Sequence, residues 1–347
     1  MLVRTIRTPI YTRACATGIS SLMHKRLMTI VATPASKPEV VLGDHEKVNH
    51  TAIENADNEF ISDFMFSHPG YNKVDMDKVT PGHRPTKTIT DWVAFFTMRC
   101  LRTSFDFFSG YKHAENVSEE EIKTAIAEGH PERYTLTSEQ WLSRIVFLES
   151  IAGVPGSVAG FIRHLHSLRM LRRDKAFVET LLEEAYNERM HLLTFLQIGN
   201  PGWFARSLLY VGQGVFCNLF FAFYLISPKI CHRFVGYLEE EAVLTYTRCL
   251  NDIDRGLIAG LDDYEVPDIA KRYWRMEDNA SMRDLINYVR ADEAKHAEVN
   301  HSFANLKLNG EDRNPFALKI EGVNKPQPSK GLETLRMQGW EREDLIV

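Results

Sequence analysis

The chain has 347 residues and an ordinary composition, with 44% hydrophobic and 25% charged residues. Its formal net charge of −5 excludes the strongly basic class of nucleic-acid-binding proteins, and a chain of this length can bury a large core. The five cysteines are odd in number and include no Cys-x-x-Cys pair, so neither a disulfide framework nor a zinc knuckle is indicated. We expect a folded protein of a reducing compartment that does not bind nucleic acid.

Residues 1–38 differ from the rest of the chain in charge. They contain no Asp or Glu but many Ser and Thr residues. Their basic residues are Arg4, Arg7, Arg13, Lys25, Arg26 and Lys37. This composition is typical of a mitochondrial transit peptide. A secretory signal needs a longer apolar stretch than 27–31, which Thr29 interrupts, whereas an unstructured tail without a targeting role is the other alternative.

The remaining chain divides into an arm, a helical domain and a tail. Residues 39–88 are polar and contain two Pro-Gly pairs, which predicts an extended arm. From 89 to 306 the apolar residues follow a helical period, so we expect an all-α domain, with a loop or short surface helix at 115–133. The tail, 307–347, is rich in Pro and Gly and is expected to be loosely ordered. The predicted helices span 89–110, 138–173, 175–199, 203–227, 229–256 and 281–305.

Two segments could contact a membrane. Residues 207–228 carry no charge, and as a helix they extend about 32 Å, enough to span a bilayer. However, spanning would bring charged residues of the neighbouring helices, such as Glu183, Arg233 and Asp252, into hydrocarbon. The segment 92–112 is aromatic but charged. We therefore expect both segments to lie in one membrane interface, which makes the protein monotopic rather than transmembrane.

Two of the predicted helices carry a Glu-x-x-His motif, whose two members share one helix face. These pairs are Glu188 with His191 and Glu293 with His296. Glu293 and His296 continue an apolar row that includes Ile286 and Val289. A third pair, Glu298 with His301, points away from this row and is expected on a solvated or interfacial face.

Each motif helix is preceded by a helix with a carboxylate on its apolar face. Glu149 lies in the apolar run 145–152, and Glu239 shares a face with Val243 and Tyr246. A ferritin-like four-helix di-iron bundle uses this order of one Glu, a Glu-x-x-His, one Glu and a second Glu-x-x-His. Carboxylates and imidazoles suit iron that cycles between its ferrous and ferric states. The predicted ligands of two non-haem irons are Glu149, Glu188, His191, Glu239, Glu293 and His296.

These motifs resemble those of the alternative oxidases, the cyanide-insensitive ubiquinol oxidases of mitochondria. The similar segments are 148–150, 187–192, 238–242 and 290–296, and their order and surroundings agree from about residue 92 to 303. The resemblance implies the same six iron ligands. It also implies an enzyme that oxidises ubiquinol and reduces oxygen to water without pumping protons, on the matrix side of the mitochondrial inner membrane.

The resemblance implies roles for further residues. Tyr246 would be a redox-active tyrosine, although its residue type and position alone favour an ordinary core tyrosine. The residues implied to orient ligands or protons are Asn187, His232, Trp274 and Asp292. The residues implied to line the quinol pocket are Arg102, Asp106, Arg144, Leu148 and Thr245. A contact stripe of His164, Leu168 and Arg169 would join two copies into a homodimer.

Two other functions fit parts of the pattern. A di-iron hydroxylase that acts on a quinone precursor would share the ligands but would not need Tyr246. A ferritin-like iron-handling protein or a membrane scaffold would not turn over quinol. The apolar segment 207–228 and the aromatic segment 92–112 argue against a soluble iron store.

Overall fold

The computed structural model describes residues 63–111 and 117–347, and within them the chain is helical, without strands. The predicted leader, 1–38, lies outside the described residues. The long helices are α3 (Ile89–Ser109), α5 (Ser138–Arg169), α6 (Phe177–Gly199), α7 (Trp203–Ile226), α8 (Pro228–Asp254) and α10 (Met282–Asn305). The short helices are α2 (Lys73–Asp77), α4 (Glu119–Ala127) and α9 (Asp268–Trp274), with single 3₁₀ turns η2 (Pro131–Arg133) and η3 (Arg342–Asp344).

The long helices confirm the all-α prediction, with small shifts at the helix ends. Local sequence explains where they begin. At the start of α5, the Thr137 side chain accepts from the Gln140 backbone, and the Gln140 side chain accepts from the Thr137 backbone. Ser281 and Asp284 form the same reciprocal cap at the start of α10. These caps satisfy backbone donors that have no partner inside the helix, which fixes the first turn.

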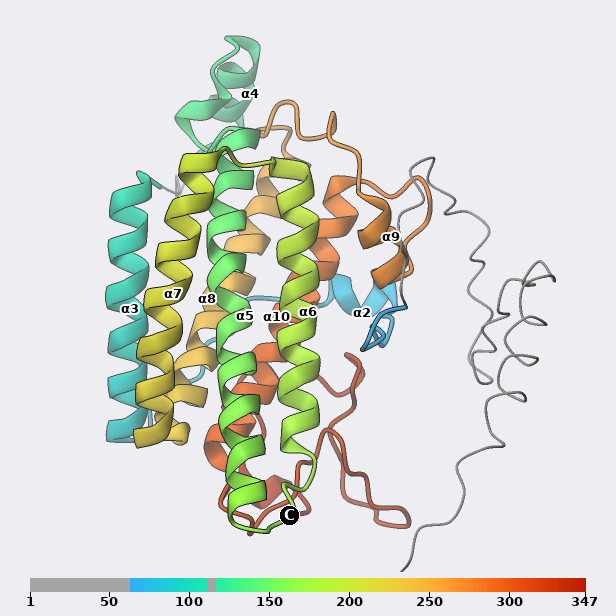
Figure 1. Cartoon of the computed structure of the whole chain (residues 1–347). Coiled ribbons are helices and arrows are strands. Elements are labelled where there is room, and N and C mark those ends of the chain that lie inside the picture. The colour runs from blue at the N-terminus through green and yellow to red at the C-terminus, as the bar shows by residue number, and fades with distance from the viewer. Residues whose placement is uncertain (1–62, 112–116) are drawn as a thin grey trace, which may run out of the picture. The chain divides into compact units, whose positions relative to one another are not determined.

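Helices α5, α6, α8 and α10 form a four-helix bundle, in which α5 packs along α6 and α8 packs along α10 (Figure 1). Two glycines permit close approach of neighbouring helices, Gly156 between α5 and α6 and Gly236 between α8 and α10. A Cβ at Gly156 would lie 2.7 Å from the Leu181 carbonyl oxygen, and a Cβ at Gly236 would lie 2.4 Å from His301 Nδ1. Any larger residue would push the helices apart. The close pairs therefore bring side chains from four helices into one small space.

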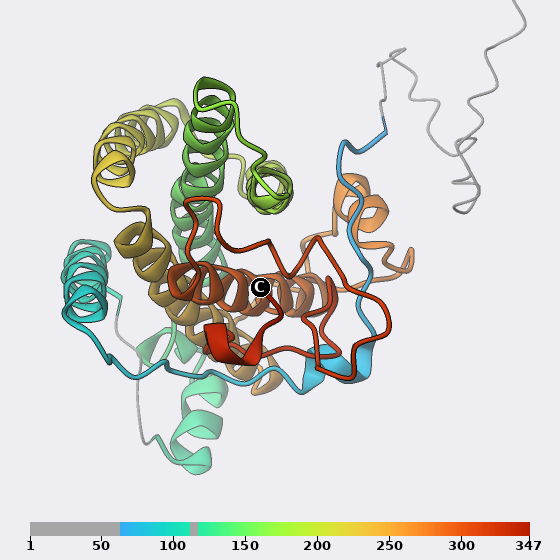
Figure 2. The ribbon, with the colours of Figure 1, turned by 90° about the horizontal axis from the view of Figure 1, so that it is seen from below.

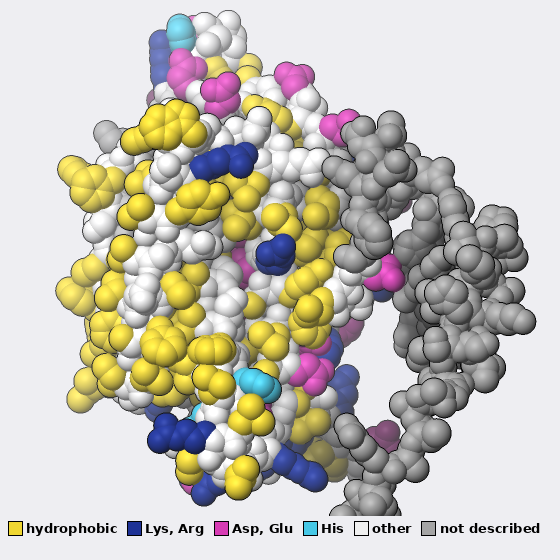
Figure 3. Space-filling view, in the orientation of Figure 1, with side chains coloured by type: hydrophobic (Ala, Val, Ile, Leu, Met, Phe, Trp, Pro, Cys, Tyr) yellow, Lys and Arg dark blue, Asp and Glu magenta, His cyan; other side chains and the backbone are white. Residues whose placement is uncertain are grey.

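Helices α3 and α7 lie on the same side of the bundle, α3 against α8 and α7 against α5 and α8 (Figures 1 and 2). Apolar side chains gather over these two helices (Figure 3). By length and composition, α5 and α7 could each cross a membrane, but the apolar window of α5 is 56% buried in the protein and that of α7 only 11%. The most exposed apolar side chains on α3 and α7 are Ile89, Phe107, Phe108, Trp203, Phe204, Tyr210 and Ile226.

The described part of the arm, residues 63–88, and the tail pack against the bundle beside α10 (Figure 2). In the arm, Met76 and Val79 are buried in a cluster with Val243 of α8 and Ala294 of α10. In the tail, Trp340 is 1% exposed. The tail has little regular helix, but the expected loose order of 307–347 is corrected by this packing, since buried side chains anchor the segment to the bundle.

The expected position of Glu298 and His301 is wrong. Both are 0% exposed, because the arm and the tail cover this face of α10. Glu298 Oε1 accepts a hydrogen bond from Trp340 Nε1 at 2.6 Å, and Glu298 Oε2 pairs with Lys295 Nζ at 2.6 Å. His301 Nε2 lies 2.8 Å from Glu240 Oε1. The helical period identifies the apolar face of α10, but it contains no information about which irregular segments cover the other faces.

The contact between Trp340 and Glu298 predicts that Trp340→Phe destabilises the protein. The change removes the Nε1 donor to a buried carboxylate and keeps an aromatic ring, so the free energy of unfolding should fall by about 1–3 kcal/mol. Denaturant unfolding followed by circular dichroism measures the difference. As a control, Trp203→Phe changes a side chain that is 80% exposed and should cost less than about 0.5 kcal/mol. Equal stability of Trp340→Phe and the wild type would contradict the anchoring role of the tail.

Candidate metal centre

Six acidic and histidine side chains meet inside the bundle, and each is at most 6% exposed. Their potential ligand atoms form two groups, and within each group all atoms lie within 4.8 Å of one another. The first group is Glu149, Glu188, His191 and Glu293. The second group is Glu188, Glu239, Glu293 and His296. The structure thus brings together all six side chains that the sequence predicts as ligands. Because Glu188 and Glu293 belong to both groups, they lie where carboxylates would bridge two metal ions.

Several atoms of this cluster have no hydrogen bond. Both carboxylate oxygens of Glu188, Oε2 of Glu293 and Nδ1 of His296 are buried without a hydrogen-bond partner. His296 Nδ1 lies 2.6 Å from Glu188 Oε1, but the angles are unsuited to a hydrogen bond. Buried polar atoms are rarely left unpaired in native proteins. The unpaired oxygens and imidazole nitrogen therefore fit a cluster that binds metal ions.

The charges of the cluster lead to the same conclusion. Burial raises the pKa of Glu149 above its usual range, although His191 favours the carboxylate. Burial and then repulsion by Glu293 raise the pKa of Glu239 well above its usual range. For Glu188, the two nearby histidines outweigh burial, and its pKa is lowered. The protein alone thus supplies too little positive charge to offset the burial of Glu149 and Glu239, and bound divalent cations would supply the remainder.

Asp292 contacts His191 from the side opposite the cluster. Its Oδ2 accepts from Trp274 Nε1 at 2.8 Å and from Asn187 Nδ2 at 3.1 Å, and it lies 3.2 Å from His191 Nε2. The Trp274 ring stacks on the His191 ring with 5.6 Å between centroids. With Nε2 bonded to Asp292, His191 directs Nδ1 towards Glu149 Oε2, 3.2 Å away. Three residues predicted to orient ligands therefore lie beside a predicted ligand.

His68, in the arm, joins this network. Its Nε2 lies 2.9 Å from Asp292 Oδ1, and the side chain is 2% exposed. Burial opposes the ionisation of Asp292, but His68 and His191 outweigh it and hold the pKa of Asp292 well below its usual range. The sequence pattern does not identify His68, because it lies in an irregular segment whose neighbours, Pro69 and Gly70, indicate only a turn.

His232 is farther from the cluster than expected for a residue that orients a ligand. Its Nδ1 bonds to Asn300 Oδ1 at 2.9 Å, and its Nε2 bonds to the Tyr224 hydroxyl at 3.0 Å. Burial lowers the pKa of His232 to about 4, so the ring is neutral near pH 7. Asn300 Nδ2 donates to the His296 carbonyl oxygen at 3.1 Å and to Glu184 at 2.9 Å. His232 is therefore linked to the cluster through Asn300, which the helical period places on the inward face of α10 without indicating a role.

An apolar cavity of about 490 Å³ reaches the cluster between α3, α5, α7 and α8. Its lining includes Glu149, Glu239 and Tyr246, next to apolar side chains of all four helices. The Tyr246 hydroxyl donates a hydrogen bond to Glu149 Oε1. A long apolar molecule that enters from the α3 and α7 side would therefore come into contact with Tyr246 and with three of the predicted ligands, Glu149, Glu239 and Glu293.

The residues predicted to line a quinol pocket lie in or behind this cavity. Arg102, Leu148 and Thr245 belong to the lining. Asp106 and Arg144 do not, but they support Arg102: Arg102 Nε donates to Asp106 Oδ2 at 2.8 Å, and Arg144 Nη2 donates to Asp106 Oδ1. Arg102 Nη1 also donates to Thr245 Oγ1 at 2.9 Å. The polar groups thus form one connected network between α3, α5 and α8.

Comparison with known proteins decides the family. The chain matches the family "Alternative oxidase" over residues 71–305, a range that contains the whole cluster. The chain belongs to the alternative oxidase family. It is 51% identical over 330 residues to "Alternative oxidase, mitochondrial" of Yarrowia lipolytica, which covers 95% of this chain and 88% of the relative.

Two further relatives agree. A protein of the same name from Scheffersomyces stipitis is 48% identical over 340 residues, 95% of this chain and 93% of the relative. "Alternative oxidase 2, mitochondrial" of Candida albicans is 52% identical over 293 residues, 84% of this chain and 78% of the relative. The resemblance stated from the motifs is confirmed, and the chain is an alternative respiratory oxidase.

The two overlapping ligand groups of this alternative oxidase predict different losses of metal. Glu188→Ala and Glu293→Ala should each remove both ions, because each carboxylate belongs to both groups. Glu149→Ala and Glu239→Ala should each weaken one ion and retain the other. The measurement is the iron content per chain after loading with Fe²⁺ and gel filtration. Glu298→Gln, a buried carboxylate on another face of α10, is the control and should retain wild-type iron. Iron loss in the control but not in Glu293→Ala would mean that the face of α10 with Glu298, and not the face with Glu293, binds the metal.

Proposed function

We propose that the chain is a ubiquinol oxidase that reduces oxygen to water at a di-iron centre without pumping protons. The observation that carries the proposal is the apolar cavity that reaches the Glu/His cluster. A soluble iron store has no need for an apolar cavity beside its ligands. Family membership supplies the oxidase activity, and the cavity supplies the reason for a lipid-soluble substrate.

Two irons, when bound, would transfer electrons from quinol to oxygen by cycling between their ferrous and ferric states. The proposed ligands are Glu149, Glu188, His191, Glu239, Glu293 and His296. In the full reaction two ubiquinols lose four electrons and four protons, and these convert one oxygen molecule into two waters. The buried carboxylates beside the cavity are close enough to accept and return the protons.

The chain's own residues would fix the geometry. Asp292, with Asn187 and Trp274, holds the His191 ring in one orientation, so that Nδ1 faces the carboxylates. His232 would act near the other histidine, His296, because it bonds to the Asn300 side chain, which in turn donates to the His296 carbonyl oxygen. Both networks are buried, which keeps them free from competition with water.

The quinol head group would bind at the polar network of the cavity. Arg102 and Thr245 present a guanidinium and a hydroxyl to the cavity, and Asp106 with Arg144 fixes the position of Arg102. Leu148 would pack against the ring, and the apolar lining of α7 would receive the tail. This arrangement combines an apolar binding volume with a few polar groups that orient the substrate.

Tyr246 would pass one of the four electrons to oxygen and would be reduced again by an electron from ubiquinol, so that the two ubiquinols still supply all four. It lines the cavity, and its hydroxyl donates to Glu149 Oε1, so its proton can pass to that carboxylate as the electron leaves the ring. Burial and the negative charge of Glu149 raise the pKa of Tyr246 well above its usual range, so the hydroxyl holds its proton until that step.

The exposed apolar faces of α3 and α7 would lie in the matrix-side interface of the mitochondrial inner membrane. Both faces are on the side of the apolar cavity, so a quinol could enter from the lipid without crossing water. The names of the relatives support a mitochondrial location, and residues 1–38 would be the cleaved leader. The helical domain would span 89–306, preceded by the arm of 39–88.

A second copy of the chain would cover the exposed end of α5. Phe161 and Leu165 are 55% and 48% exposed, close to the predicted stripe of His164, Leu168 and Arg169. Neighbouring exposed apolar side chains of this kind are typical of a surface that contacts another protein. The chain would therefore form a homodimer through α5.

Oxygen uptake by the purified, iron-loaded protein with ubiquinol and cyanide tests the function, and Tyr246→Phe tests the electron source. The wild type should consume oxygen in the presence of cyanide and form no hydroxylated quinone. Tyr246→Phe should retain iron but lose nearly all turnover, because phenylalanine cannot release a proton and an electron.

The control for this experiment is Tyr237→Phe. The Tyr237 hydroxyl is buried without a hydrogen-bond partner on another face of α8, and its loss should leave turnover near wild type. A hydroxylated product would instead favour the hydroxylase alternative. Near-wild-type turnover of iron-loaded Tyr246→Phe would rule out the tyrosine as the electron source.

The interfacial proposal predicts that Phe223→Asp on α7 weakens membrane binding without unfolding the protein. Phe223 is 59% exposed, and a buried Phe side chain contributes roughly 1.5–3 kcal/mol, so partition into vesicles should fall by about tenfold or more. Flotation with inner-membrane lipids measures this. Val323→Asp in the tail, at a site 44% exposed, is the control and should float like the wild type. Protease cleavage next to α7 from the outer face of sealed inner-membrane vesicles would favour a transmembrane helix instead.

A further inference from the structure

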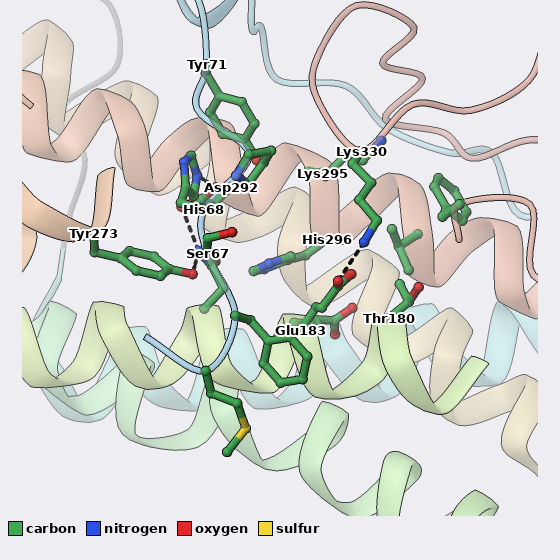
Figure 4. A pocket seen from close by; sticks show the side chains of 17 residues that line it. Ser67, His68, Tyr71, Thr180, Glu183, Tyr273, Asp292, Lys295, His296 and Lys330 are labelled. Atoms are coloured by element: carbon green, nitrogen blue, oxygen red, sulfur yellow. Dashed lines mark hydrogen bonds and ion pairs between the residues drawn. The ribbon is translucent and has the colours of Figure 1, made fainter. Parts of the chain in front are cut away.

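A second cavity, of about 370 Å³, approaches the cluster between α6, α10, the arm and the tail (Figure 4). Its lining is more polar than that of the first cavity, although apolar side chains such as Phe66 and Phe316 also belong to it. It includes the carboxylates of Glu183, Glu184 and Asp292. His296, a proposed metal ligand, also belongs to this lining. The two cavities therefore approach the same centre from different sides, and the second offers more polar groups than the first.

Two buried atoms in this lining have no hydrogen-bond partner. They are Oδ1 of Asn187, a side chain 7% exposed, and Nδ1 of His296, a side chain 6% exposed. An amide oxygen and an imidazole nitrogen are both ligands that divalent metal ions accept. The residues of the lining thus offer carboxylates, an amide oxygen and an imidazole nitrogen to a cation, beside the ammonium groups of Lys295 and Lys330.

A salt bridge spans the outer part of the cavity. Lys330 Nζ of the tail lies 2.6 Å from Glu183 Oε1 of α6, and the two side chains are 48% and 28% exposed (Figure 4). Farther inside, Glu184 is buried, and both its oxygens accept from Asn300 Nδ2, at 2.9 and 3.0 Å. Exposed ion pairs contribute little free energy, so the Glu183 carboxylate can exchange its lysine partner for another cation.

We propose that this polar cavity is the route by which hydrated divalent metal ions reach the centre. The inference rests on the metal centre proposed above. The apolar cavity is unsuited to this task, because a hydrated cation would have to lose its water next to side chains such as Val215 and Leu219. In the polar cavity, Glu183 and then Glu184 offer carboxylate oxygens in place of water before the ion meets His296.

The test measures the rate of Co²⁺ uptake by the full-length protein after its metal has been removed by chelation. Stopped-flow absorption of the Co²⁺ complex reports uptake independently of turnover. Glu183→Gln should slow uptake by about fivefold, since it removes one attractive charge at the entrance. Lys330→Gln should speed uptake by a similar factor, since it removes a repulsive charge. If the salt bridge only stabilised the fold, both variants would change uptake in the same direction.

Two controls complete the experiment. Glu179→Gln removes a carboxylate that lies 3.6 Å from the same lysine but is not part of the lining, and it should change uptake less than Glu183→Gln. Ser67→Trp, at an exposed position of the lining, should slow uptake more than Glu183→Gln, whereas Val215→Trp in the apolar cavity should leave uptake unchanged.

The outcomes separate the two proposals. If the wild-type protein takes up no Co²⁺, the metal centre itself is wrong, and the route with it. If the wild type takes up Co²⁺ but Glu183→Gln and Lys330→Gln act alike or not at all, the metal centre stands and the route is wrong. Slower uptake in Val215→Trp than in Ser67→Trp would likewise overturn the polar route.

Discussion

Four carboxylates and two imidazoles share one buried space. The surrounding residues have to offset the charge of these groups and hold them in position. Such a group is costly without cations and without directional support, because burial disfavours every charge. The support comes from a second layer of buried polar residues, of which Asp292 is the centre. Asp292 and Glu293 are adjacent in α10 but point to opposite sides of His191: one bonds to Nε2, the other lies near Nδ1. One helical turn thus supplies both a proposed ligand and the group that orients its neighbour.

The same cluster separates two chemically different regions of the protein. On the α3 and α7 side, apolar side chains are exposed outside and continue inward along the apolar cavity. On the α10 side, the arm and the tail cover the bundle, and the cavity there is more polar. A lipid-soluble reductant is favoured by an apolar lining, whereas a hydrated ion needs polar groups that can replace its water. The position of the cluster between the two cavities allows both to reach it.

Much of the bundle and of the cluster could be predicted from the sequence, because both depend on helical periodicity. A carboxylate within an apolar run, such as Glu149, or on the apolar face of a helix, such as Glu239, points inward from its position alone. The same period places Glu184 and Asn300 on inward faces without showing what they bond to, and His68 lies in an irregular segment that has no period. Their partners are distant in sequence and meet them only after the helices and the arm have packed. Predicting them requires the tertiary contacts, which no local pattern contains.

The wrong prediction that Glu298 and His301 lie on a solvated or interfacial face shows how α10 differs from a surface helix. A periodic pattern predicts one buried face, yet α10 is covered on every side, and its polar residues each bond to a different segment. Asp292 contacts the arm through His68, His301 contacts α8 through Glu240, and Glu298 contacts the tail through Trp340. Directional bonds of this kind fix the rotation and register of a helix more strictly than apolar packing does, since a small shift would leave a buried polar group unpaired. The hydrogen bonds of Asp292, Glu298 and His301 therefore fix the position of Glu293 and His296, although none of these bonds involves either residue.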